Sequence, residues 1–151
     1  MSDAIRSKLP TAARILLGLA FFVFGLNGFL QFAPNPPMPE EAGAFMGALA
    51  ATGYMFPLIK GTEVVAGLLL LGGRFVPLAL VLLAPILVNI VLFHVVLAPA
   101  NMAMVFVLLA LELYLAWAYR DSFRAVLQAD ARPTANSPAA GGVLREATAT
   151  R

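Results

Sequence analysis

Lys60 and Glu63 constrain the fold of this chain most, because they stand at the start of an otherwise apolar stretch. The apolar run that follows, Val64 to Gly72, has nine residues, whereas the hydrocarbon core of a bilayer is roughly 30 Å thick and needs about 20 helical residues. A helix that spans a membrane here must therefore include both charges. Ionisable residues at membrane depth are costly and usually face the bundle interior, as a buried pair or a functional site.

Composition places the chain among integral membrane proteins. Hydrophobic residues make up 61% of the 151 residues, and charged residues make up only 12%. This length favours one domain, without a separate soluble catalytic module. The chain has no basic stripe for nucleic acid and no cysteine, so thiolate nucleophiles and protein-ligated iron–sulfur clusters are excluded. It has a single histidine, and we assign no residue to a metal site.

Four apolar segments are near the length of a spanning helix. The expected spans are residues 11–33, 54–72, 75–98 and 102–119. Lys and Arg residues lie before the first span, between the second and third, and after the fourth, but not in the other two loops. The positive-inside rule then places both termini in the cytoplasm. Short turns at Gly72-Gly73 and at residues 99–101 make successive helices antiparallel neighbours.

The predicted fold is therefore all-α, a membrane-embedded four-helix up-down bundle. Residues 1–10 form a cytoplasmic N-terminal segment, 11–120 the transmembrane domain, and 121–151 a cytoplasmic extension that ends in a disordered tail. In the first outer loop, Pro39 and two glutamates favour the start of a short interfacial helix over residues 42–52, which Gly53 ends.

Strongly polar side chains gather in the outer and central layers of the predicted bundle. The residues are Asn27, Lys60, Glu63, Asn89, His94 and Glu112. Lys60 and Glu63 are three residues apart and can touch on one helix face. Asn89 and His94 are five apart and point about 140° from each other, so only one of them faces the centre of a straight bundle. Glu112 is deepest, at roughly 15 Å.

Each polar residue has a structural as well as a functional interpretation. Lys60 and Glu63 can be an internal ion pair and nothing more. The asparagines can hold helices together by hydrogen bonds, and a lone histidine can be a packing residue. Glu112 must be paired, with Lys60 for example, or be protonated. The functional alternative is proton exchange or ligand hydrogen bonding by Glu63, Glu112 and His94, with Asn27, Lys60, Asn89 and His94 holding a cofactor.

Four stretches carry a family resemblance over residues 11–120. They are RILLGLAFFVFGLNGF (14–29), KGTEVVAGLLLLGGRFVPLAL (60–80), APILVNIVLFHVVLAP (84–99) and LELYLAWAYR (111–120). The chain resembles DoxX and DoxX-like membrane proteins. The resemblance implies a small four-helix protein of the bacterial cytoplasmic membrane, in a family named for a subunit of an archaeal thiosulfate:quinone oxidoreductase. The lack of cysteine leaves sulfur oxidation unsupported here.

Three functions remain open from sequence. The first is a redox-associated subunit that binds a quinone or isoprenoid in the polar outer layer, as part of a quinone-linked oxidoreductase with a separate membrane or soluble partner. Haem fits less well, because one histidine cannot supply two axial ligands. The second is a non-enzymatic scaffold or partner subunit. The third is a small proton-coupled carrier, which with four helices would need to act as a homo-oligomer.

Overall fold

The computed structural model describes residues 3–34, 37–99, 102–124 and 126–130, with side chains described from residue 8 onward. Within these ranges the only regular secondary structure is α-helix, without a strand. The chain has two compact units, Met1–Tyr119 and Arg120–Arg151. The first holds α1 (Asp3–Leu30), α2 (Glu40–Ala51), α3 (Met55–Gly72), α4 (Val76–Val96) and α5 (Met102–Ala118); the second holds α6 (Arg120–Phe123).

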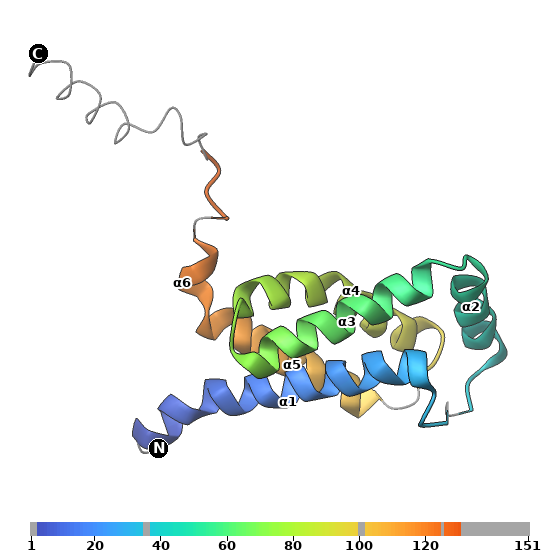
Figure 1. Cartoon of the computed structure of the whole chain (residues 1–151), viewed down its shortest axis with the longest axis horizontal. Coiled ribbons are helices and arrows are strands. Elements are labelled where there is room, and N and C mark those ends of the chain that lie inside the picture. The colour runs from blue at the N-terminus through green and yellow to red at the C-terminus, as the bar shows by residue number, and fades with distance from the viewer. Residues whose placement is uncertain (1–2, 35–36, 100–101, 125, 131–151) are drawn as a thin grey trace, which may run out of the picture. The chain divides into compact units, whose positions relative to one another are not determined.

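The first unit is a helical bundle in which α1 packs on α3 and α5, and α4 packs on the same two helices. Figure 1 shows these four long helices running alternately in opposite directions, with α2 at one end of the bundle. The largest fully buried side chains are Leu17, Phe21, Leu70, Leu83, Leu87 and Leu115. The all-helical fold is thus as the sequence predicts.

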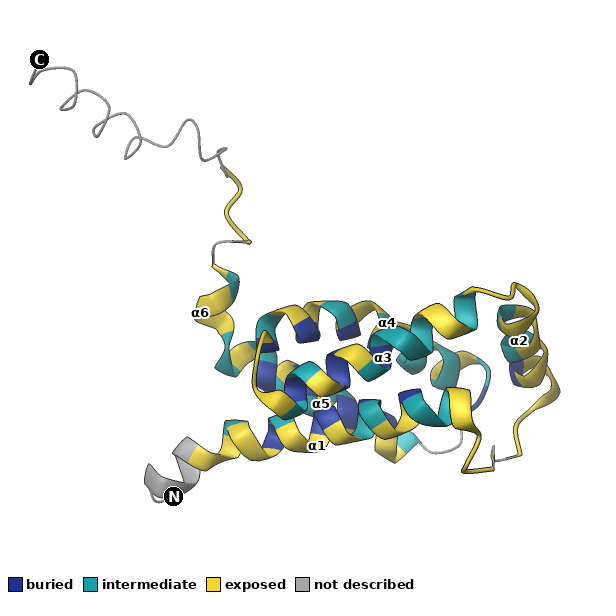
Figure 2. Cartoon of the chain, viewed as in Figure 1, coloured by how far each residue is buried: buried dark blue, intermediate teal, exposed yellow. Residues whose placement is uncertain are grey.

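Three helices are long and apolar enough to cross a membrane: residues Lys8–Leu30 of α1, all of α3 and all of α4. Helix α5 is equally apolar but has 17 residues. Large apolar side chains are exposed on all four helices, including Leu16, Leu68, Leu92 and Leu113, and Figure 2 shows exposed residues along their outer faces. Such faces suit contact with lipid chains rather than water.

Helix boundaries depart from the predicted spans mainly at α1. This helix begins before residue 11 and ends at Leu30 instead of continuing to residue 33. Asn27 explains the end, because its Oδ1 accepts from the Ala33 N–H (2.7 Å) and its Nδ2 donates to the Ala33 carbonyl (3.3 Å). Gln31 takes a positive φ of 49° beside this link. The side-chain amide therefore competes with continuation of the helix.

A short helix before Gly53 and a tight turn at Gly73 are present where the sequence predicts them. Helix α2 begins after Pro39 and ends before Gly53, whose φ is +74°. Gly73, at φ +66°, ends α3: its N–H bonds the Leu70 carbonyl, and the Arg74 N–H bonds the Leu69 carbonyl. This is a Schellman motif. The outer turn at residues 100–101 and the predicted tail over 131–151 lie outside the described residues.

Helices α1 and α3 approach closely because glycines line their contact. A Cβ at Gly67 would lie 2.7 Å from the Phe22 nitrogen and 2.9 Å from the Gly18 carbonyl oxygen, both backbone atoms. A Cβ at Gly25 would lie 2.9 Å from the Val64 nitrogen. Backbone cannot yield as a flexible side chain can, so these positions admit only glycine at this helix separation.

At the opposite end from α2, Arg14 joins α1 to the end of α3. Its guanidinium Nη1 donates to the Leu70 carbonyl and to the Leu71 carbonyl, the latter at 3.1 Å. Both carbonyls lie in the last turn of α3, at the negative end of the helix dipole. The Leu70 carbonyl also accepts from the Gly73 N–H, and Arg14 is the donor to the Leu71 carbonyl. The missing side chain of Gly73 leaves room for the guanidinium.

We expect Arg14→Met to lower the free energy of unfolding by about 1.5–3 kcal/mol, because it removes the charge-assisted hydrogen bonds to the Leu70 and Leu71 carbonyls. Arg74→Met is the matched control: Arg74 lies in the same turn but is exposed, so its loss should cost less than about 0.5 kcal/mol. SDS titration in mixed micelles, followed by circular dichroism, measures both. If both variants lose the same free energy of unfolding, Arg14 contributes only through its positive charge and not through its hydrogen bonds.

Candidate functional site

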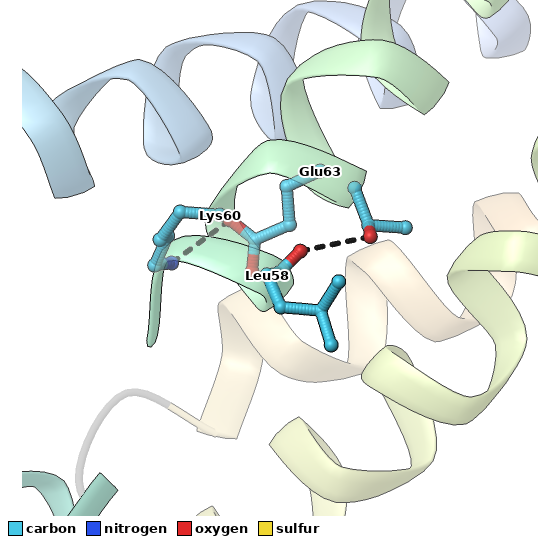
Figure 3. A network of polar contacts seen from close by, with 4 residues as sticks. Leu58, Lys60 and Glu63 are labelled. Atoms are coloured by element: carbon cyan, nitrogen blue, oxygen red, sulfur yellow. Dashed lines mark hydrogen bonds and ion pairs between the residues drawn. The ribbon is translucent and has the colours of Figure 1, made fainter. Parts of the chain in front are cut away.

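The ion pair predicted on α3 forms, as Figure 3 shows. Lys60 Nζ donates to Glu63 Oε2 at 2.8 Å. Glu63 is only 2% exposed, and the Lys60 side chain is 19% exposed. Lys60 Nζ also lies 5.9 Å from the Phe56 ring centroid, within reach of a cation–π attraction. The two opposite charges are therefore largely buried as a pair, and each offsets the cost of burying the other.

Gly28 on α1 makes this geometry possible. A Cβ at Gly28 would lie 2.5 Å from Cγ and 2.6 Å from Cδ of Lys60. The aliphatic stem of Lys60 thus crosses α1 where that helix has no side chain. Without this gap the stem would have to turn away from α1, and its ammonium group would move relative to Glu63.

A cavity of about 650 Å³ opens beside the pair at the α2 end of the bundle. We call it the head cavity. Its walls come from α1, α3, α4 and α5, with Met46 of α2. The polar side chains in its lining are Asn27, Gln31, Lys60, Glu63 and His94. Most of the remaining lining is apolar, including Phe21, Phe24, Phe56 and Leu108.

A second cavity of about 380 Å³ lies among α2, α3 and α4, and we call it the side cavity. It shares six lining residues with the head cavity: Met46, Phe56, Lys60, Glu63, Ile90 and His94. The ion pair and the histidine therefore face both spaces. Apart from these shared residues and Asn89, the lining of the side cavity is apolar.

One ring nitrogen of His94 is engaged in a hydrogen bond. Its Nδ1 lies 2.8 Å from the Ile90 carbonyl oxygen. A carbonyl only accepts hydrogen bonds, so Nδ1 carries the proton, and Nε2 of the neutral ring is left as an acceptor. The edge of the His94 ring meets Phe93 at 5.3 Å between centroids, and Phe93 contacts Phe45 of α2 at 5.8 Å.

The two predicted asparagines take different positions. Asn27 lines the head cavity, but its amide is already bonded to the Ala33 backbone. Asn89 is exposed and lines only the side cavity. Asn89 and His94 both line the side cavity, and only His94 also lines the head cavity.

Glu112 stands apart from the ion pair. It is 6% exposed, and its Oε2 has no hydrogen-bond partner among the described residues. It lines neither cavity, although Leu108, one turn earlier on the same face of α5, lines the head cavity. Among the described residues no ion pair joins Glu112 to Lys60, which was one of the alternatives above; Lys60 pairs with Glu63.

Sequence reasoning missed the apolar walls of both cavities, such as Met46, Phe56 and Ile90. In a chain that is 61% hydrophobic, an apolar residue beside a cavity has the same pattern as one in the core. Gly28 lies in a glycine-rich helix, and this pattern indicates close packing against another helix. Its contact with Lys60 was not predictable, because it depends on the rotation of α1 against α3. In the described ranges, no three His, Asp or Glu side chains come close enough to hold a metal ion.

We expect opposite stability effects from the two buried carboxylates. Glu63→Met leaves the Lys60 ammonium without its partner and should destabilise the protein by about 3 kcal/mol. Glu112→Met removes an oxygen that lacks a hydrogen bond and should stabilise it by about 1–3 kcal/mol. The same micelle titration measures both variants.

The double variant Lys60→Met with Glu63→Met serves as the control for the first effect. It removes both charges and should recover most of the loss, because replacing both partners of a buried pair is close to neutral. A double variant as unstable as Glu63→Met alone would mean that the side-chain shapes, and not the charges, matter at this position.

Comparison with known proteins agrees with this architecture. The sequence model of the DoxX family matches residues 9–95, which include Asn27, Lys60, Glu63 and His94. The uncharacterized protein YwoB of Bacillus subtilis (strain 168) is 31% identical over 135 residues, covering 85% of this chain and 88% of that protein. No solved structure matches the chain. With the apolar helices described above, these matches show that the chain is a membrane-helical protein that belongs to the DoxX family.

Proposed function

We propose that this protein binds the head group of a quinone or a similar isoprenoid at the Lys60–Glu63 ion pair. The observation that carries the proposal is the position of that pair in the wall of a cavity of about 650 Å³ with largely apolar lining. Ligand pockets typically have roughly 300–1,000 Å³ and combine apolar walls with a few convergent polar groups. A charged pair that served only for stability would need no cavity beside it.

The donor set fits a ring that bears carbonyl groups. Lys60 has three N–H donors and uses one on Glu63, so the others can reach a ring oxygen. His94 offers Nε2 as an acceptor for a ring hydroxyl. Phe21, Phe24 and Phe56 supply apolar and aromatic walls. When bound, a quinone would supply two-electron, two-proton chemistry, while Glu63 could hold a proton beside the ring.

Electrons would have to come from a separate partner in this proposal. The chain has no cysteine and one histidine, so a single copy cannot ligate an iron–sulfur cluster or a bis-histidine haem. We therefore propose the role of a membrane subunit in a quinone-linked oxidoreductase, with its electron donor or acceptor on another protein.

We further propose that the protein resides in the bacterial cytoplasmic membrane with both termini inside. In this arrangement Arg14 and Arg74 lie on the inner side, at the end of the bundle where α3 ends and α4 begins, in agreement with the positive-inside rule. The two cavities then lie toward the outer face. Helix α2, whose Phe45 packs on Phe93, would lie at the outer interface.

A direct test titrates the purified protein in nanodiscs with short-chain benzoquinone and naphthoquinone, using isothermal calorimetry. We expect saturable binding of one of them. The double variant of Lys60→Met with Glu63→Met should bind at least about tenfold more weakly, because it loses charge-assisted hydrogen bonds of about 1.5–3 kcal/mol each while the fold is kept.

Arg74→Met is the control, since it removes a positive charge at the far end of the bundle. Unchanged binding by the double variant would overturn the site. No binding of either quinone would overturn the function. In that case a stable protein partner in pull-down experiments would point to a scaffold, and proton flux in vesicles would point to a carrier.

A further inference from the structure

The lining of the head cavity is more polar than the lining of the side cavity. Residues that line only the head cavity include the amides Asn27 and Gln31. Lys60, Glu63 and His94 line both cavities. Residues that line only the side cavity are apolar apart from Asn89: Phe45, Leu49, Met55, Ile59, Pro85, Ile86 and Phe93. Polarity therefore falls from the head cavity, past the ion pair, into the side cavity.

We infer, on the basis of the head-group site proposed above, that the side cavity holds the first part of the ligand's hydrocarbon chain. The substrate class is then a lipid with a polar ring and an attached chain, rather than a small soluble quinone. The ring would lie in the head cavity at Lys60, and the chain would pass the shared wall and run between α3 and α4.

The shared lining, which places the two cavities side by side, is the observation that selects a chain as the occupant of the side cavity. A separate small molecule there would have to share Lys60, Glu63 and His94 with the first ligand, since these side chains line both spaces. One molecule that extends through both spaces meets the shared polar groups once, at its ring. Its chain then meets the apolar part of the lining.

Helix α2 covers this path from the end of the bundle. Phe45, Met46 and Leu49 of α2 contribute to the lining, and Phe45 packs against Phe93. Ala42 of the same helix is fully buried. A chain in the side cavity would thus be enclosed by α2 and would leave the protein sideways, between α3 and α4, which line the rest of this cavity.

A photoreactive probe tests the path of the chain. The probe is a benzoquinone, or the naphthoquinone if that ring binds, with a ten-carbon alkyl chain that carries a diazirine near its midpoint. After irradiation of the full-length protein in nanodiscs, peptide mass spectrometry locates the label. Only labelling that excess short-chain quinone competes away is counted, because that competition reports the head-group site.

We expect competed labelling on α3 and α4 at the side cavity, near Ile59 and Ile86. Ile86→Trp fills this cavity from α4 and should reduce the competed label there at least fivefold. Leu92→Trp is the matched control, because Leu92 is an exposed residue of the same helix that lines neither cavity. If Ile86→Trp does not fold, Ile59→Trp replaces it and fills the cavity from the α3 side. If neither variant folds, the position of the label in the unmodified protein decides whether the chain follows this path.

The outcomes separate the two proposals. Competed labelling confined to Phe24 and Met104, on the α1 and α5 walls of the head cavity, would overturn the chain path and leave the head-group site intact. Equal labelling of the side cavity in Ile86→Trp and Leu92→Trp would also overturn it. Absence of any competed labelling, together with absence of short-chain binding in calorimetry, would overturn the head-group site itself.

Discussion

The close approach of α1 and α3 is the constraint on which the rest of the structure depends. Gly18, Gly25 and Gly67 line this contact, and a Cβ at any of them would lie within 3.1 Å of backbone atoms of the facing helix. In lipid, where helices gain nothing from hiding apolar surface from water, such contact is a main source of association. It also fixes the rotation of α3, and this rotation turns Lys60 across Gly28 and directs Glu63 into the bundle.

Two charges at this depth are tolerable only as a pair. Separating Lys60 from Glu63 would leave each charge without a partner in an apolar setting. The penalty would be several kcal/mol, and neither helix packing nor exposure of the aliphatic part of Lys60 could offset it. The bond at 2.8 Å therefore stabilises the bundle relative to either single charge, though not relative to a fully apolar α3. Retaining the pair beside a cavity makes sense where a ligand uses its spare donors.

Much of the fold follows from the sequence because apolar length and basic flanks are strong signals in membrane proteins. The ion pair on α3, the turn at Gly73 and the short helix before Gly53 were all predictable from local pattern. The end of α1 was not, because it depends on the Asn27 side chain reaching Ala33 six residues later. The shared lining of two cavities was also out of reach, since it depends on how four helices rotate against one another.

Glu112 shows why polarity alone does not define the site. By depth and residue type it ranked beside Glu63, yet the structure separates them: Glu63 has a partner and faces both cavities, whereas Glu112 has an oxygen without a partner and lines neither. Burial without a hydrogen bond costs free energy, and a structural role would be filled better by leucine. The face of α5 that carries Glu112 also carries Leu108 at the head cavity, one helical turn away.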